Sequence, residues 1–229
     1  MHAHAPPTSA PSAPRLGLAL AFAAGLAVSF HSEAAAADKP ERRGGEVGVL
    51  LGGSGCIPAR GDCRFDAGQR TRGSFGLGVD LGWRAHKAFF LGAGYSIGWF
   101  TPTWKLADSD AREYRNAYQQ GAYLVLRAII PIWRIDLGFE ISPGWSQATF
   151  VAEGSETRHL SRGFSLRPGA SIDFRVGRRL YLGARVDVPL AFHSRFCTTN
   201  ASRVCGNQPT IDQLPIHQVI GGVHFGANF

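Results

Sequence analysis

The residues best suited to chemistry in this sequence are a histidine and a serine two positions apart, His159 and Ser161. A serine acts as a nucleophile when a base lies in contact with its hydroxyl group and an acid orients that base. Asp173 is the nearest acidic residue at a suitable distance along the chain. A chance pairing within a loop explains His159 and Ser161 more simply, so we expect no catalytic site and no enzyme activity.

The four cysteines form a second group with its own chemistry. They stand as two local pairs in sequence, Cys56 with Cys63 and Cys197 with Cys205. Disulfides would fit an oxidising compartment, and four cysteines allow three connectivities. We predict pairing within each local pair, while crossed pairing between the two predicted loops stays open. His193 lies near the second pair, but no spacing is typical of a four-ligand metal site, so we expect no metal and no cofactor.

Charged residues of both signs make up the third group. They recur at alternate positions of the strands predicted below, on the face that also carries glycine. Mixed charges in a low-dielectric interior must pair, since each unpaired one costs several kcal/mol. An ion path or an active site is one interpretation, but we favour a plug of salt bridges that fills a narrow barrel. The residues concerned are Glu46, Asp80, Arg84, Arg127, Arg134, Asp136, Glu140, Arg167, Asp173, Arg175, Arg185 and Asp187.

The elements that must position these residues are β-strands, and the clearest pair spans residues 73–100. Large apolar residues occupy every second position of two runs, Phe75 to Trp83 and Phe89 to Trp99. The residues between them are glycines, small polar groups and a few charges. Because successive side chains of a strand point to opposite faces, this alternation predicts a hairpin.

The two faces of this hairpin indicate a membrane. A soluble barrel would have to turn its Phe, Trp and Leu side chains inward, where eight strands leave little room. It would also place rows of glycine in water, where they weaken a strand. With the apolar face against lipid and the glycines in the lumen, both difficulties disappear, as in a transmembrane β-barrel.

The rest of the chain repeats the pattern and predicts eight strands. Four long loops, at 53–72, 101–117, 147–161 and 194–213, alternate with three short turns, one of them around Pro131. Outer-membrane barrels have this asymmetry, with long loops outside and short turns in the periplasm. Aromatic residues near the strand ends form two predicted girdles. Three prolines, Pro143, Pro168 and Pro189, each remove a ladder donor, so we expect bulges or strand ends there.

The chain begins with a predicted secretory signal. Residues 16–28 are an apolar stretch too short for a membrane-spanning helix, and four alanines precede Asp38. We therefore divide the chain into a cleaved signal peptide at 1–37, a polar lead-in at 38–45 and the barrel at 46–229. The net charge of +7 comes without a basic run or stripe. The sequence therefore does not indicate nucleic-acid binding.

The last strand carries a family resemblance. Phe229 ends the chain, with Val219, Val223, Phe225 and Ala227 at alternate positions behind it. This arrangement resembles the C-terminal signal by which bacterial outer-membrane proteins are recognised for assembly; its main residues here are Val223, Phe225 and Phe229. The predicted mature chain as a whole is similar to the small eight-stranded barrels of the outer-membrane protein A/X type. The resemblance implies an all-β, antiparallel, up-and-down transmembrane barrel in the outer membrane of a Gram-negative bacterium.

The resemblance implies membrane insertion but no one activity, because a fold does not fix a function. We expect a structural or surface-interaction role, with disulfide-tied loops outside. The expected partners are outer-membrane lipid, lipopolysaccharide and the assembly machinery, around a monomer. The alternatives are a narrow pore or a lipid-modifying enzyme. The pair His159 and Ser161 resembles the His-x-Ser pair of eight-stranded lipid A deacylases, which also use a glutamate. The acid available here is instead an aspartate, Asp173, and strand alternation turns it into the lumen.

Overall fold

The computed structural model describes residues 42–57, 74–100, 114–152, 154–200, 202–208 and 216–229. The predicted signal peptide and the first half of the lead-in lie outside this part of the chain. The described strands are β1 Gly44–Ile57, β2 Ser74–His86, β3 Phe89–Phe100, β4 Tyr114–Ile132, β5 Ile135–Ala152, β6 Arg158–Val176, β7 Leu180–Asp187, β8 Leu190–Thr199, β9 Arg203–Gly206 and β10 His217–Asn228. None of the described segments is a helix long and apolar enough to cross a membrane.

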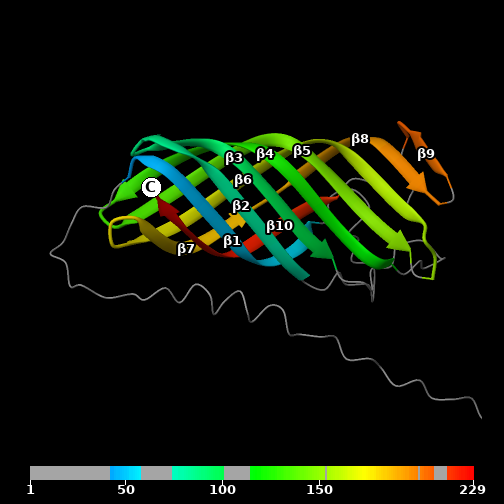
Figure 1. The fold of residues 1–229 in the computed structure, drawn as a ribbon, viewed down its shortest axis with the longest axis horizontal. Coiled ribbons are helices and arrows are strands. Elements are labelled where there is room, and N and C mark those ends of the chain that lie inside the picture. Colours follow the sequence, from blue (N-terminus) through cyan, green and yellow to red (C-terminus); the bar gives the residue numbers. More distant parts are fainter. Residues whose placement is uncertain (1–41, 58–73, 101–113, 153, 201, 209–215) are drawn as a thin grey trace, which may run out of the picture. The chain divides into compact units, whose positions relative to one another are not determined.

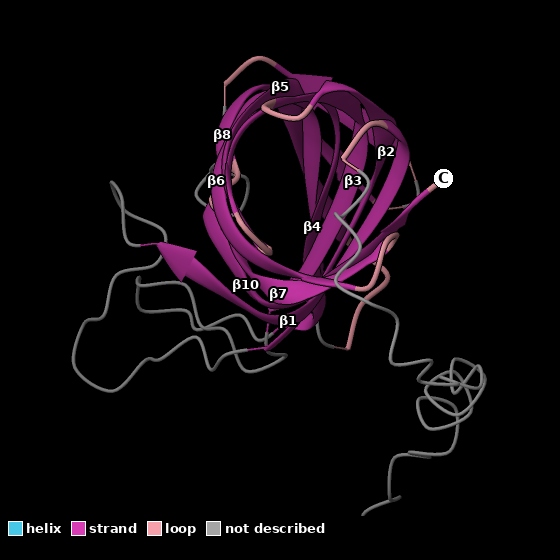
Figure 2. Ribbon diagram, turned by 90° about the vertical axis from the view of Figure 1, so that its left-hand side faces the viewer, coloured by secondary structure: helices cyan, strands magenta, loops and turns pink. Residues whose placement is uncertain are grey.

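The strands close into a barrel, which Figure 2 shows as a ring. Each strand from β1 to β6 pairs antiparallel with the next, and β6 then pairs with both β7 and β8. The barrel closes where β10 pairs with β7 on one side and with β1 on the other. Because β7 and β8 are successive parts of one barrel strand, the closed barrel has the eight predicted strands. The short strand β9 is not part of this closed barrel, because it pairs with β8 beyond the barrel wall (Figure 1).

Only one of the three prolines lies at a strand end, as predicted; Pro143 and Pro168 lie inside β5 and β6, where we expected bulges or strand ends. Pro189 stands in the break between β7 and β8. Pro168 faces this break on β6, where its carbonyl accepts a bond of 2.8 Å from the backbone N–H of Val188. Pro143 lies inside β5. The pairing of β5 with β4 is interrupted there, between the pair Tyr123–Gly144 and the pair Leu126–Ile141.

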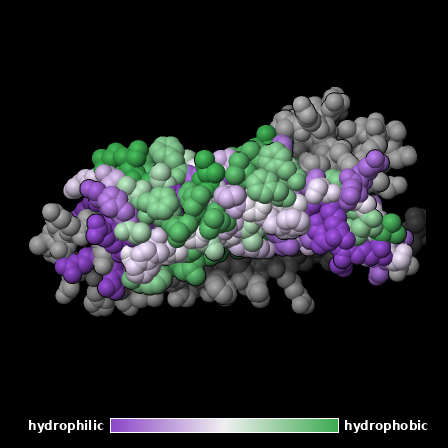
Figure 3. Space-filling model, turned by 90° about the horizontal axis from the view of Figure 1, so that it is seen from above, coloured by the Kyte–Doolittle hydropathy of each residue, from purple (hydrophilic) through white to green (hydrophobic). Residues whose placement is uncertain are grey.

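The outer surface of the barrel is apolar and the inner surface is polar, as the alternation predicts. On β2, Leu81 is 57% exposed while the neighbouring Asp80 is 2% exposed. The same contrast repeats around the ring, so that hydrophobic residues cover the middle of the face seen in Figure 3 and polar residues its two ends. Water would oppose such an exposed apolar belt, whereas lipid hydrocarbon favours it.

Two aromatic girdles bound this belt. Trp83, Phe89, Trp133, Phe174 and Phe229 lie at the end with the short turns, and all are exposed. Phe75, Trp145, Phe164 and Phe192 are exposed at the other end, where Trp99 is half-buried. Phe164 and Phe174 are ten residues apart on β6, which corresponds to a height of about 25 Å at the tilt usual in such barrels. This height matches the apolar band of an outer-membrane barrel.

Several predicted boundaries are wrong. The predicted loop 147–161 is mostly strand, because β5 continues to Ala152 and β6 begins at Arg158. The predicted loop 194–213 likewise contains the end of β8 and all of β9. The turn expected around Pro131 lies at Trp133 and Arg134, and Trp133 has a φ of 50°. The barrel itself begins at Gly44, two residues earlier than expected.

Glycines on the inner face make room for side chains that fill the lumen. A Cβ atom on Gly94 would lie 2.4 Å from a carboxylate oxygen of Asp80 and 2.8 Å from a guanidinium nitrogen of Arg167. A Cβ atom on Gly98 would lie 2.0 Å from the side-chain amide of Gln218. The glycine face is therefore a packing requirement of the polar interior.

Candidate functional site

The centre of the lumen holds a cluster of three arginines around two carboxylates, Asp80 and Glu140. Arg127 donates to Asp80 at 2.5 Å and to Glu140 at 2.9 Å, and Arg167 reaches the same two carboxylates at 3.0 and 2.8 Å. Arg185 bonds to both as well, at 2.9 Å to Glu140. Asp187 joins the cluster through Arg185 at 2.7 Å. The five strands that supply these groups are thereby tied across the barrel.

A second cluster lies toward the short turns, around Asp136. Its carboxylate accepts from Arg84 at 2.8 Å, from Arg175 at 2.7 Å and from Arg42 at 3.0 Å. Glu46 lies between the clusters, 3.7 Å from Arg84 and 3.6 Å from Arg127. The two clusters are thus parts of one network.

The structure places all nine residues of the predicted charge network inside the barrel, each at most 7% exposed. They are Glu46, Asp80, Arg127, Asp136, Glu140, Arg167, Asp173, Arg185 and Asp187. Arg84 and Arg175, which alternation also assigned to the lumen, are buried with them. Arg134 is an error of that assignment, because it lies in the turn after Trp133 and stacks on that ring at 5.5 Å.

The second cluster leaves little free space around its side chains. Residues of this second cluster, around Asp136, line a cavity of about 10 Å³ together with Tyr181 and Asp173. That is about the room one water molecule needs. Arg127 and Arg167 also stack on the rings of Phe90 and Tyr123, at 5.0 and 4.6 Å. At this level the interior is a packed core.

A histidine on β8 is in hydrogen-bond contact with two serine hydroxyl groups, the contact that a serine nucleophile requires. His193 is 8% exposed and lies between two serines, with Ser146 Oγ 2.8 Å from its Nε2 and Ser161 Oγ 2.8 Å from its Nδ1. A neutral imidazole accepts at one nitrogen and donates at the other, so one serine donates to the ring and the other accepts from it. The histidine links β5, β6 and β8.

The predicted trio of His159, Ser161 and Asp173 does not come together. His159 lies 3.4 Å from the hydroxyl of Thr198, while Ser161 contacts His193 instead. Asp173 lies twelve residues further along β6, about 40 Å away, and pairs with His224 at 2.7 Å. These three residues therefore form no triad. That the protein is not an enzyme stays a prediction.

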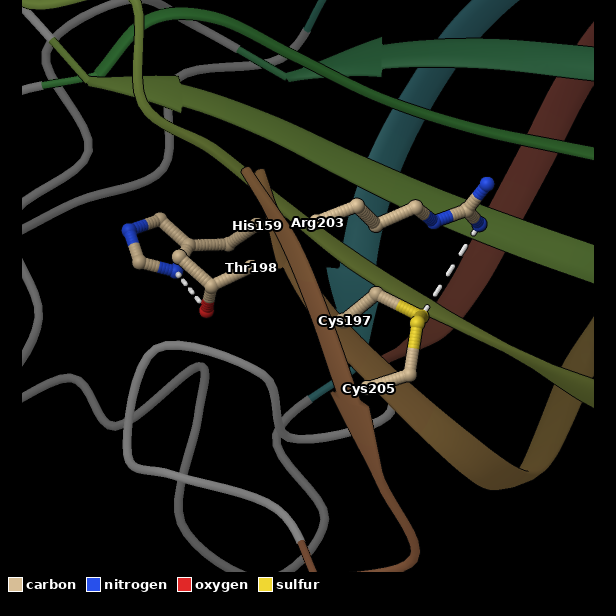
Figure 4. The surroundings of a disulfide bond; sticks show 5 residues. All are labelled: His159, Cys197, Thr198, Arg203 and Cys205. Carbon is tan, nitrogen blue, oxygen red and sulfur yellow. Dashed lines mark hydrogen bonds between the residues drawn. A yellow bond between two sulfur atoms is a disulfide. The ribbon is translucent and has the colours of Figure 1, made fainter. Parts of the chain in front are cut away.

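A disulfide joins β8 to β9 beyond the girdle. Cys197 and Cys205 are directly opposite in the ladder and are bonded, which confirms the predicted local pair. Figure 4 shows the disulfide and Arg203 on one side of β8, and His159 with Thr198 on the other. Cys56 lies near the end of β1, whereas its predicted partner Cys63 lies outside the described residues.

The residues of the predicted assembly signal lie on β10 and just after it. Val223 and Phe229 are 52% and 65% exposed, and Phe225 is half-buried on the same outer face. The backbone of Phe229 exchanges two hydrogen bonds with Gly45, of 2.9 and 2.8 Å. The end of the chain is thus paired to β1 at the closure of the barrel.

Among the described residues, no group of three His, Cys, Asp or Glu side chains could hold a metal ion. The sequence also matches no family model and no curated protein. A solved structure does match, that of Neisserial surface protein A. The two chains are 10% identical, with a TM-score of 0.51, and the match covers 81% of this chain and 97% of the other.

The fold is that of a small outer-membrane β-barrel. This conclusion concerns the fold, because an identity of 10% carries no activity from one chain to the other. The outer-membrane barrel accounts for both faces of the strands. Its lipid-facing belt explains the exposed aromatic residues, and its narrow lumen explains the buried arginines.

Sequence reasoning missed the contacts of two buried histidines, His193 and His224. Both stand at inward positions of their strands, so the alternation itself places them in the lumen. Their partners Ser146 and Asp173 come from strands far away in sequence. Only the register between strands brings such groups together, and the sequence alone does not give that register.

Proposed function

We propose that the chain is an integral protein of a bacterial outer membrane whose barrel anchors a surface-exposed sheet made of the outer parts of β5, β6, β8 and β9. The observation that carries the proposal is the contrast between a continuous apolar belt outside and a lumen filled by salt bridges. Such a barrel fits a membrane anchor better than a channel, since the charges that could line an ion path are bonded to one another.

The extension beyond the girdle supports a role at the surface. β8 continues seven residues past Phe192, and the disulfide holds β9 against it. The β5–β6 turn reaches the same end at Gly154–Thr157. Because the short turns and Phe229 lie at the opposite end, we assign this extension to the outside of the cell and the short turns to the periplasm.

Epitope insertion on intact cells tests this orientation. One variant carries the epitope after Ser155, in the exposed β5–β6 turn, and a matched variant carries it after Lys87, in the exposed β2–β3 turn. We expect antibody to label the first on intact cells and the second only after the outer membrane is permeabilised. Labelling of the second alone on intact cells would reverse the orientation. Recovery of the protein in the soluble fraction would contradict the membrane assignment.

A further inference from the structure

Four arginines share one face of the sheet beyond the outer girdle. Arg162 on β6 is directly opposite Arg195 on β8, and Thr199 of β8 stands between Arg158 on β6 and Arg203 on β9. Residues directly opposite in antiparallel strands have their side chains on the same face. This face, which we call the arginine face, is the outward one, because Arg162 and Arg158 alternate in step with Phe164.

In the part of the chain that the structure describes, the arginine face has none of the counter-charges that the lumen provides. Arg158, Arg195 and Arg203 are exposed, and within the described residues Arg158, Arg162 and Arg195 form no ion pair. The Nε of Arg162 is buried without a hydrogen-bond partner. Arg203 donates to the Sγ of Cys197 at 3.8 Å (Figure 4). Of the described acidic side chains, only Glu156 lies beyond the girdle, in the exposed turn before β6.

Such an arrangement calls for an anion from outside the chain. Arg162 and Arg195 are directly opposite in the sheet. Like charges in such positions repel each other and destabilise the pair. Arginine presents a planar fork of donors that fits phosphate oxygens in a bidentate manner. Two neighbouring guanidinium groups therefore match the charge of a phosphorylated ligand.

The position of the arginine face relative to the outer girdle indicates which kind of anion it binds. Phe164 and Phe192, whose rings stack at 6.1 Å, mark the outer edge of the belt. Arg162 stands two residues beyond Phe164 on the same face, about 7 Å along the strand. This is the level at which aromatic girdles meet lipid headgroups. A phosphate on a lipid beside the barrel would lie within reach of both arginines.

We propose that Arg162 and Arg195, assisted by Arg158 and Arg203, bind the phosphate groups of a lipid in the outer leaflet next to the barrel. The ligand class is a phosphorylated glycolipid of the outer leaflet. This inference rests on the proposed orientation and gives the surface-exposed sheet a specific partner, which also fixes the depth of the barrel in the membrane.

Native mass spectrometry of the refolded full chain tests the proposal. The wild type, R162Q/R195Q and the charge-matched control R178Q/R179Q are refolded in detergent and transferred to phosphatidylcholine nanodiscs. Each receives a bisphosphorylated diglucosamine lipid or its dephosphorylated form. Arg178 and Arg179 lie in the turn between β6 and β7, at the opposite end of the barrel.

We expect the wild type and the control to retain the phosphorylated lipid in preference to the dephosphorylated one. We expect R162Q/R195Q to bind it at least about tenfold more weakly, since two charge-assisted hydrogen-bonding groups are removed. Equal retention by R162Q/R195Q and the wild type, or no preference for phosphate, would overturn the proposal. Competition by dextran sulfate, which does not enter a bilayer, would identify a site for soluble polyanions and overturn the lipid assignment.

The folded state of each sample is read from a gel before transfer. A wild type that gives a compact, heat-modifiable band but ignores lipid phosphate overturns only the arginine face as a lipid site. A wild type that gives no such band overturns the membrane proposal itself, and the lipid site with it. The two failures are thus distinguished in one experiment.

Discussion

The lumen and the arginine face carry the same side chain in opposite circumstances. Inside the barrel, Arg167 is fully buried and bonded to two carboxylates. Beyond the girdle, Arg195 is exposed and opposite another arginine. A buried charge must find its counter-charge within the protein because desolvation costs several kcal/mol, whereas a charge at a headgroup surface finds it in water or lipid. The membrane level therefore decides which charges the chain itself pairs.

Removing one carboxylate from the lumen gives the largest effect. Glu140→Gln leaves Arg127, Arg167 and Arg185 with less negative charge in a buried network, so we expect about 3–5 kcal/mol less stability. Urea unfolding in lipid vesicles, followed by tryptophan fluorescence, measures this loss. The control Glu156→Gln removes an exposed carboxylate and should change stability by less than about 0.5 kcal/mol. Equal effects of the two variants would show that the network is not a paired, buried core.

A charge placed on the belt gives the next largest effect. Leu81→Arg puts a guanidinium group in lipid, which costs roughly 2–4 kcal/mol near mid-bilayer and should prevent normal membrane assembly. The matched control is Val204→Arg on β9, where the side chain is 68% exposed beyond the girdle. Vesicle refolding yield separates the two variants. Normal assembly of Leu81→Arg would mean that the apolar face does not meet lipid.

Loss of the disulfide gives the smallest and most local effect. The bond closes a loop with a sequence separation of 8, so its entropic contribution is about 2–3 kcal/mol. We expect C197S/C205S to keep the barrel band on a gel but to be cleaved faster by protease between β8 and β9. Protection equal to that of the wild type would show that the β-pairing alone holds β9.

Within the apolar belt, the sequence predicts correctly which face of each strand points outward. Beyond the outer girdle, it does not predict that the strands continue. Within the belt, one side of each strand must be apolar, so alternation alone placed Leu81 outside and Asp80 inside. Beyond the girdle, both sides of a strand can be polar, and Gln147 and Arg158 give no such contrast. The sequence therefore predicts a loop over the segments that carry them, although these segments continue β5 and β6.

The candidate sites follow the same rule. The lumen carboxylates and arginines could be found by position, because inward residues of a narrow barrel have nowhere else to go. The contact of His193 with Ser146 and Ser161 depends on how β8 is aligned with β6, and a bulge beside Gly163 shifts that register. The sequence does not specify such a shift, so the only candidate partner it offers for Ser161 is His159, two positions away, and not His193.

The measurement that tests the central claim most directly is heat-modifiability on a gel after refolding residues 38–229. The chain is refolded in parallel into detergent micelles, into lipid vesicles and into plain buffer. We expect a compact band that shifts on boiling, obtained only with detergent or lipid. A soluble, monomeric β-protein in plain buffer would contradict the assignment of the apolar face to the membrane.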